Sequence, residues 1–147
     1  PRATGVGIDV APAALDLARR NALALGVAER VVWGEELGVV ERGFDVVVAN
    51  LPYIPSTDLA GLDADVRLWE PASALDGGPD GLDVFRAVLP RLPALLTATG
   101  LALLEVGAGQ ADALEPLAAA TPGLRCARRW RDLAGIDRVV ELRRGSA

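Results

Sequence analysis

The sequence predicts an α/β fold with a mainly parallel sheet and an antiparallel edge strand at its carboxy-terminal end. Short apolar runs alternate with stretches whose apolar residues recur at helical spacing. The run 44–50, FDVVVAN, is nearly all apolar, as expected of a parallel strand covered on both faces. The last two apolar runs are joined by RDLAGI alone, which is short enough for an antiparallel return.

The apolar runs are the expected strands, and they cover residues 6–10, 30–33, 44–50, 101–106, 124–130 and 137–144. Between the third and fourth runs lies a connection from residue 51 to about residue 80 that is rich in Pro, Gly and Asp. It is longer than ordinary connections within a domain, so we interpret it as a candidate functional loop.

Three helices are expected between the strands. The first covers 11–26, with Pro12 suited to its first turn. The second should begin near Asp80 and break around Pro90 and Pro93, because two prolines cannot both lie inside one regular helix. The third, QADALEPLAAA, precedes the fifth strand.

Length and charge narrow the classes of function. A chain of 147 residues has the length of one domain, and we expect residues 1–147 to form a single domain. The net charge of -5 and the sequence pI of about 4.7 provide no broad basic surface for phosphate backbones. This argues against non-specific nucleic-acid binding and favours a protein or small-molecule substrate.

The chain has no histidine and a single cysteine, Cys126. This composition excludes imidazole bases, Ser-His relays and disulfide frameworks, and we expect no metal site. No apolar run approaches the roughly 18 residues that span a bilayer, and no basic-then-apolar leader is present. We therefore expect a cytoplasmic protein without a membrane segment.

Acidic residues follow the first two expected strands. Asp9 has the placement that nucleotide-binding folds use to hold ribose hydroxyls, but it would equally suit the positive end of the helix that follows. Glu35 can accept a hydrogen bond from an adenine amino group, or it is a solvated loop residue.

The tetrapeptide Asn50-Leu51-Pro52-Tyr53 follows the third expected strand. Asn50 can present its amide oxygen beyond the strand end, where open α/β sheets bind ligands. Pro52 pushes Leu51 toward an extended conformation and so constrains the direction of the Leu51 carbonyl. Two such acceptors beside the Tyr53 ring suit a planar group bearing an NH2, such as an amide or an amino-purine. The alternative is a turn in which Tyr53 simply packs.

The stretch VGAGQ, 106–110, follows a strand and opens a helix. A lone GxG is weak evidence for a cofactor loop. With Asp132 further along the chain it leaves open a circularly permuted cofactor site, and the alternative is a tight strand-to-helix turn.

Five stretches together carry a family resemblance, and they are GIDVAPAALDLARRNA, FDVVVANLPYIP, VRLWEPASALDGGPDGLDVFR, LLEVGAGQ and DLAGIDRVVELR. They resemble the HemK/PrmC family, the S-adenosylmethionine-dependent N5-glutamine methyltransferases that modify the Gly-Gly-Gln motif of peptide chain release factors. The resemblance runs from about Gly7 to Arg144. The Asn-Pro-Pro-Tyr type of motif is shared with amino methyltransferases of DNA and RNA, whereas EPASALDGGPDGLD and DLAGIDR resemble this family specifically.

The resemblance implies a Rossmann-like class I methyltransferase sheet, S-adenosylmethionine as cofactor and release factors as protein substrates. It implies that Asp9 binds the cofactor ribose and that Glu35 lies beside the adenine. Asn50 would sit between cofactor and substrate, and it and the Leu51 carbonyl would accept hydrogen bonds from the glutamine NH2. Tyr53 would pack against that amide.

The sequence departs from the family pattern at three places, and one of them is Glu36, which replaces an aromatic residue that the family often has near the adenine. Leu51 stands where the family has a first proline, so only Pro52 restrains this turn. Glu70 and Pro71 match a family element near the substrate loop and would support that loop.

The family's acid-plus-GxGxG cofactor loop would precede residue 1. We therefore expect a truncated methyltransferase domain that lacks the first, central strand. Its absence would leave an empty slot between the strands ending at Asp9 and Asn50. By itself this chain should be impaired as an enzyme.

Two other interpretations stay open. The first is an amino methyltransferase acting on adenine in RNA or DNA, which the acidic pI argues against. The second is a non-catalytic methyltransferase-like fragment that a partner chain completes.

Overall fold

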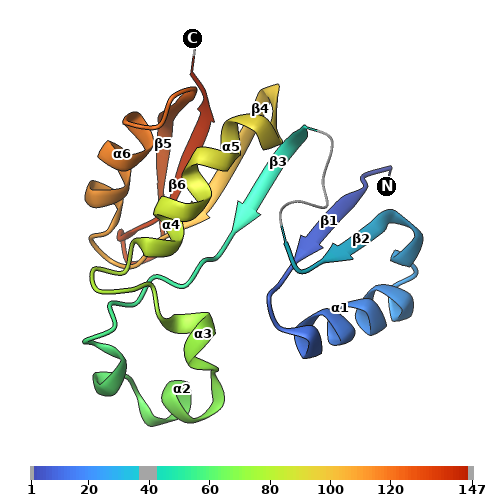
Figure 1. Cartoon of the computed structure of the whole chain (residues 1–147), viewed down its shortest axis with the longest axis horizontal. Coiled ribbons are helices and arrows are strands. Elements are labelled where there is room, and N and C mark those ends of the chain that lie inside the picture. Colours follow the sequence, from blue (N-terminus) through green and yellow to red (C-terminus); the bar gives the residue numbers. More distant parts are fainter. Residues whose placement is uncertain (1, 37–42, 146–147) are drawn as a thin grey trace. The chain divides into compact units, whose positions relative to one another are not determined.

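The computed structural model describes residues 2–36 and 43–145 (Figure 1). The chain divides into two compact units, residues 1–42 and residues 43–147, and each is described by itself. The first unit contains β1 (Gly5–Ile8), α1 (Pro12–Ala24), the 3-10 helix η1 (Ala28–Arg30) and β2 (Val31–Gly34).

In the first unit, β1 and β2 form a parallel pair in register from Gly5 opposite Val31 to Ile8 opposite Gly34. The crossover between them is α1, which has Pro12 in its first turn as the sequence predicts. Gly7 packs against the ring of Trp33, and a Cβ at this position would collide with that ring. The absence of a side chain at Gly7 therefore permits the close packing of the two strands.

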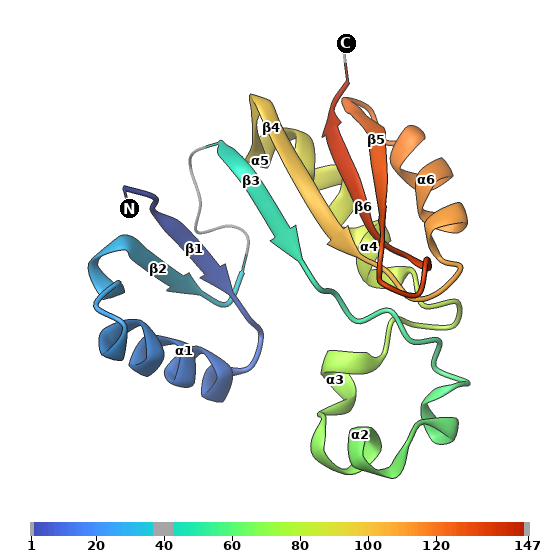
Figure 2. The same ribbon diagram turned by 180° about the vertical axis from the view of Figure 1, so that it is seen from behind.

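The elements of the second unit alternate strands with helices: β3 (Phe44–Ala49), η3 (Leu59–Gly61), α2 (Ala64–Trp69), α3 (Ala72–Leu75), α4 (Asp83–Val88), η4 (Leu89–Arg91), α5 (Leu92–Leu95), β4 (Leu96–Glu105), α6 (Ala111–Ala119), β5 (Leu124–Arg131) and β6 (Asp137–Arg144). Their sheet has the order β3-β4-β6-β5 (Figure 2). Strand β3 is parallel to β4, whereas β6 is antiparallel to both β4 and β5.

Helices α4, α5 and α6 lie on one face of this four-stranded sheet (Figures 1 and 2). The core forms between them, and its largest fully buried side chains are Phe85, Leu89, Leu92, Leu96, Leu104, Leu114, Leu142, Val106 and Val140. The placement agrees with right-handed crossovers from β3 to β4 and from β4 to β5, which put consecutive helices on the same side of a sheet.

The structure confirms the predicted α/β class and refines several elements. Strand β4 begins at Leu96, earlier than the predicted 101, and the predicted helix break appears as η4 between α4 and α5. The antiparallel carboxy-terminal strand β6 lies one place inside the sheet, with β5 at the edge. The long connection contains η3, α2 and α3, which the sequence did not predict.

The expectation that β3 is covered on both faces is wrong for the structure as described. Val46 and Val48 are 52% and 74% exposed, because they lie on the face of the sheet opposite to α4, α5 and α6. Among the described strands, β1 pairs with β2 alone and β3 pairs with β4 alone. Each of β1 and β3 therefore keeps one edge without a partner strand in the described part of the chain.

Within the described ranges, no helix combines the length and apolar character needed to cross a membrane.

Three carboxylates surround Arg129 on β5. Its Nη1 lies 2.6 Å from Asp112 Oδ1 and 3.2 Å from Asp137 Oδ2, and its Nη2 lies 2.6 Å from Glu115 Oε2. Asp112 and Glu115 belong to α6 and Asp137 to β6, so one guanidinium ties the helix to two strands. Hydrogen bonds from Arg129 lower the pKa of Glu115, and those from Arg131 and then Arg129 lower the pKa of Asp137.

We expect Arg129→Met to weaken the acid dependence of folding stability. Carboxylates with a depressed folded pKa contribute stability above their unfolded pKa of about 4 and lose that stability as the pH falls through the folded pKa. Without the guanidinium, the thermal unfolding midpoint should fall less between about pH 5 and about pH 2 than it does in the native chain.

Arg125→Met is the matched control, because Arg125 is exposed on the same strand and makes no ion pair within the described residues. It should retain the native acid dependence. A native acid dependence in Arg129→Met would contradict the role of this cluster.

Candidate functional site

A cavity of about 100 Å³ lies at the carboxyl end of β3. Its lining combines the predicted tetrapeptide with the start of the long connection and α3: Asn50, Leu51, Tyr53, Ile54, Ala74 and Leu75. The volume corresponds to about three water molecules at roughly 30 Å³ each, so the cavity suits a small group rather than a whole nucleotide base with its sugar.

Two hydrogen-bond acceptors of this cavity are available. The Asn50 side chain is exposed, and within the described residues it makes no hydrogen bond. The Leu51 carbonyl likewise accepts no hydrogen bond from the described part of the chain. Asn50 and Leu51, whose side-chain amide and backbone carbonyl have no internal partners among the described residues, therefore both line one cavity. The sequence predicts these two acceptors for binding an NH2 group.

Tyr53 is held at both of its ends. Its hydroxyl donates to Glu105 Oε1 over 3.5 Å, which is a long and weak contact, and its carbonyl accepts a hydrogen bond from Gln110 Nε2 at 2.7 Å. The ring is half-buried and lines the cavity. Tyr53 thus belongs to the cavity wall, and its backbone is anchored to the segment that follows β4.

The long connection returns to pair with the chain just beyond Tyr53. The Ile54 N–H donates to the Leu75 carbonyl at 2.9 Å, and the Ile54 carbonyl accepts from the Gly77 N–H at 2.9 Å. Further on, the Ser56 N–H donates to the Gly78 carbonyl at 2.9 Å. Ile54 and Asp76 therefore form an isolated parallel β-bridge, through which the DGG stretch of the family-like block pairs with the site loop.

Acidic residues of the same block stabilise turns. Asp76 accepts hydrogen bonds from the Ser56 hydroxyl at 2.7 Å and from the Gly78 N–H at 2.9 Å, and these lower its pKa. Asp80 accepts from Arg86 Nη1 at 2.8 Å, and the hydrogen bonds from Arg86 lower the pKa of Asp80 to about 2. Both side chains remain charged acceptors at neutral pH and are already engaged in local structure.

Two glycines permit this close pairing. A Cβ on Gly77 would lie 2.8 Å from both the Tyr53 Cα and the Gly81 Cα. A Cβ on Gly81 would collide with the Tyr53 carbonyl oxygen, and Gly81 has a φ of +75° that favours glycine. The GGPDG pattern is therefore required by the approach of this turn to the Tyr53 backbone.

Glu70 and Pro71 join α2 to α3. The Pro71 carbonyl accepts from the Ala74 N–H at 2.8 Å, and the exposed Glu70 side chain makes no hydrogen bond within the described residues. Pro71 starts α3, and α3 supplies Ala74 and Leu75 to the cavity. The support of the loop by Glu70 and Pro71 stays a prediction.

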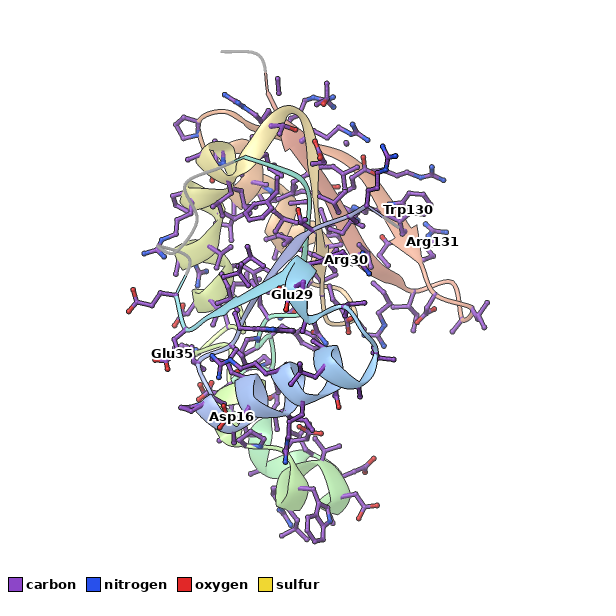
Figure 3. All side chains as sticks on the ribbon, turned by 90° about the vertical axis from the view of Figure 1, so that its right-hand side faces the viewer. Asp16, Glu29, Arg30, Glu35, Trp130 and Arg131 are labelled. Atoms are coloured by element: carbon purple, nitrogen blue, oxygen red, sulfur yellow. The ribbon has the colours of Figure 1, made fainter. Side chains whose placement is uncertain are left out.

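Asp9 and Glu35 lie at one edge of the two-stranded sheet in the first unit. The Asp9 N–H continues the pairing beyond β1 by donating to the Gly34 carbonyl at 3.2 Å, and Asp9 Oδ1 accepts from the Ala11 N–H at 2.8 Å. Asp9 Oδ2 and the exposed Glu35 carboxylate have no partner among the described residues, and Glu35 lies just past the end of β2 (Figure 3). These oxygens are available to hydroxyl or amino donors.

VGAGQ forms a tight strand-to-helix turn, and Asp132 is engaged elsewhere. Asp132 Oδ1 accepts from the N–H groups of Ala134 and Ile136 at 2.9 and 3.0 Å, which closes the β5–β6 turn. The permuted cofactor site therefore receives no support.

Burial raises the pKa of the Cys126 thiol to about 11, so this thiol stays protonated at neutral pH.

Sequence reasoning missed Gln110, which contacts the site loop although it lies in the VGAGQ turn. Its partner Tyr53 is far away in the sequence, and a glutamine at a helix start carries no pattern that names such a partner. Within the described residues, no group of three or more His, Cys, Asp or Glu is arranged to hold a metal ion.

Comparisons with known proteins place this geometry in a class. The fold resembles a ribosomal protein L11 methylase from Lactobacillus delbrueckii subsp. bulgaricus, with a TM-score of 0.65 at 16% identity over 97% of this chain and 58% of that one. It also resembles a methyltransferase from Pyrococcus furiosus, with a TM-score of 0.64 at 17% identity over 95% of this chain and 61% of that one. The fold is that of the class I methyltransferases.

Sequence comparison gives the family. The chain is 42% identical over 149 residues to the release factor glutamine methyltransferase of Rhodospirillum rubrum, covering 100% of this chain and 46% of that protein. It is 48% identical over 142 residues to that of Moorella thermoacetica, covering 94% of this chain and 50% of that protein. The resemblance to the HemK/PrmC release factor glutamine methyltransferases is confirmed, and the chain spans about half the length of the curated relatives it matches. No family model matches the chain.

We expect Gly81→Ala to destabilise the site loop. The new methyl group would meet the Tyr53 carbonyl and force an alanine into a left-handed conformation, which together cost roughly 1–3 kcal/mol of unfolding free energy. The measurement is urea unfolding of the native and variant chains.

Gly61→Ala is the matched control, because a Cβ at Gly61 has nothing within 4 Å and the residue lies in the same long connection. Equal stabilities of Gly81→Ala and Gly61→Ala would show that the turn does not press on the Tyr53 backbone.

Proposed function

We propose that this chain carries the substrate-amide site of an enzyme that transfers a methyl group from S-adenosylmethionine to the side-chain amide nitrogen of the glutamine in the Gly-Gly-Gln motif of release factors. The observation that carries the proposal is the pair of unpartnered acceptors at the end of β3, the Asn50 amide and the Leu51 carbonyl, in one cavity with Tyr53. The names of the relatives from Rhodospirillum rubrum and Moorella thermoacetica support the same reaction.

The two acceptors match the chemistry of a primary amide. An amide nitrogen is a poor nucleophile because its lone pair is delocalised into the carbonyl group. When one N–H donates to Asn50 and the other to the Leu51 carbonyl, the nitrogen is fixed in position, and both acceptors stabilise the positive charge that it gains as the new N–C bond forms. Positioning and electrostatics can then supply the rate without a strong base, which suits a chain without histidine.

Pro52 and Tyr53 complete the amide site. Pro52 fixes its own φ and restrains Leu51 in an extended conformation, which limits the directions available to the Leu51 carbonyl. The half-buried Tyr53 ring provides a flat wall against which the planar carboxamide can stack. The methylated amide loses its proton to solvent after transfer.

Asp9 and Glu35 fit the cofactor. A bound S-adenosylmethionine supplies a methyl group on a sulfonium and carries ribose hydroxyls and an adenine amino group, and these hydroxyl and amino groups are donors for carboxylate oxygens. Asp9 Oδ2 and the Glu35 carboxylate are such acceptors, and the parallel pairing of β1 with β2 puts them at the same sheet edge. We assign Asp9 to the ribose and Glu35 to the adenine.

Release factors as substrates would place the enzyme in the cytoplasm. Residues 1–147 would then act as one methyltransferase domain whose catalytic residues are Asn50, Leu51, Pro52 and Tyr53.

We expect the chain to bind a Gly-Gly-Gln peptide and to discriminate it from Gly-Gly-Glu, because a carboxylate offers no N–H to the two acceptors. Tyr53 is the single tyrosine of the chain, so isotope labelling of tyrosine gives one ring signal at the site for NMR titration. Asn50→Ala should weaken peptide binding by roughly 2- to 10-fold through the loss of one hydrogen bond.

Asn21→Ala, the same substitution at an exposed position on α1, is the matched control and should bind as the native chain does. A Tyr53 signal that responds equally to both peptides, or to neither, would contradict the amide site.

Methyl transfer is best tested in a chimera in which these residues replace the matching half of the Rhodospirillum rubrum enzyme. We expect isotope-labelled methyl groups to appear on the glutamine of a Gly-Gly-Gln peptide, and Asn50→Ala to lower kcat/KM by roughly 10²- to 10³-fold.

A competing oligonucleotide distinguishes the alternatives. Label on adenine in preference to the peptide would favour an adenine amino methyltransferase. An inactive chimera beside an active parent enzyme would favour a non-catalytic module.

A further inference from the structure

Gln110 connects three separate segments of the second unit. Its Nε2 donates to the Tyr53 carbonyl at 2.7 Å and, over a longer 3.5 Å, to the Gly81 carbonyl. Its Oε1 accepts from the Gly107 N–H at 2.8 Å. The side chain is half-buried and stands where α6 begins, with its backbone carbonyl accepting from Ala113 and Leu114.

The partners fix which end of the amide points where. The Gly107 N–H can only donate and the Tyr53 carbonyl can only accept, so the Gln110 oxygen must face Gly107 and its nitrogen must face Tyr53. A glutamate at this position would place a second acceptor against the Tyr53 and Gly81 carbonyls. The site therefore requires a side chain that accepts at one end and donates at the other.

The chain between β3 and Ile54 is free for only a few residues. Ala49 is paired with Leu104 inside the sheet, and Ile54 is paired through its N–H with Leu75 and through its carbonyl with Gly77. Between these points, Gln110 provides the one backbone anchor that the described residues make to Tyr53.

We propose that Gln110 is a positioning residue that sets the direction of the Leu51 carbonyl by holding the Tyr53 carbonyl. The intervening Pro52 has a fixed φ, so it transmits an orientation imposed at Tyr53 back to Leu51 more faithfully than a flexible residue would. This matters because Leu51 itself lacks a locked φ. The inference rests on the proposed function, since it concerns the acceptor that would bind the substrate amide.

Close packing around Gln110 agrees with this role. A Cβ at Gly107 would lie 2.8 Å from Gln110 Oε1 and 3.2 Å from Tyr53 Cδ2, so no side chain can stand between the glutamine and the loop. The start of α6 is itself anchored, because Arg129 on β5 binds Asp112 and Glu115 of this helix. Gln110 thus connects the anchored start of α6 to the loop that contains Tyr53.

The first test uses the free chain and needs no substrate. With tyrosine labelled, the native chain should give one sharp ring signal from Tyr53. Gln110→Met keeps the length of the side chain but removes its three hydrogen bonds, and it should give a broadened or divided signal. Asp112→Asn is the matched control: it alters a side chain near the start of α6, but its amide oxygen can still accept from Arg129 Nη1 and it leaves Gln110 in place, so it should keep the native signal.

The second test follows binding of the Gly-Gly-Gln peptide as a function of pH. At neutral pH, Gln110→Met and Gln110→Glu should both bind about fivefold more weakly than the native chain. Below the ordinary glutamate pKa of about 4.3, the protonated carboxyl group that Gln110→Glu introduces can again donate to Tyr53, so the deficit of this variant should shrink while that of Gln110→Met should not. Tyr53 and Glu105 are present in every variant, so the ratio of each variant's affinity to that of the native chain at the same pH isolates position 110.

Unchanged Tyr53 signals in folded Gln110→Met would overturn the inference, as would equal pH dependence in the two variants. If Gln110→Met does not fold, Gln110→Asn is the second variant, because it keeps the amide group but is too short to reach both Gly107 and Tyr53. A folded Gln110→Asn with the native signal would also overturn the inference. If the native chain does not bind the peptide, that result counts against the proposed function alone. The Tyr53 signals of the free chains still test the role of Gln110.

Discussion

The site depends on the backbone pairing between Ile54 and the turn that runs from Leu75 to Gly81. Two hydrogen bonds of 2.9 Å join Ile54 to Leu75 and Gly77, and they draw the end of a long connection back against the residues that leave β3. This pairing requires glycine at positions 77 and 81, because any side chain there would meet the Tyr53 backbone. The acidic residues of the turn hold its shape, so the family-like DGGPDGLD block shapes the site loop and does not supply reacting groups.

The loop that results has an unusual division of polar groups. The carbonyls of Tyr53 and Ile54 are consumed by Gln110 and Gly77, whereas the Asn50 amide and the Leu51 carbonyl have no partners in the described part of the chain. Unsatisfied acceptors beside a small cavity favour a ligand that brings its own donors. A primary carboxamide brings two N–H groups on one nitrogen, which is the basis of the proposal that this loop binds glutamine in preference to a carboxylate or an apolar side chain.

The two units contribute different chemistry. The first offers carboxylate oxygens at Asp9 and Glu35, suited to hydroxyl and amino donors, and the second offers the cavity of the proposed amide site. In each unit one parallel strand, β1 or β3, keeps an unpaired edge among the described strands. The relatives that match this chain are about twice as long, and an edge strand with exposed Val46 and Val48 is a surface that proteins normally cover.

The sequence by itself determined the α/β class, the order of the strands along the chain and the place of the tetrapeptide at a strand end, because apolar period, proline and glycine act locally. The prediction that Asn50 and the Leu51 carbonyl bind an amide also comes from the sequence, since Pro52 restricts its neighbour wherever the chain folds, and it stays a prediction. Only the tertiary structure decided that Gln110 holds Tyr53, that β6 lies inside the sheet beside β4, and that one face of β3 is exposed. Those outcomes depend on which distant segments meet, and the local preferences of a chain do not specify its distant contacts.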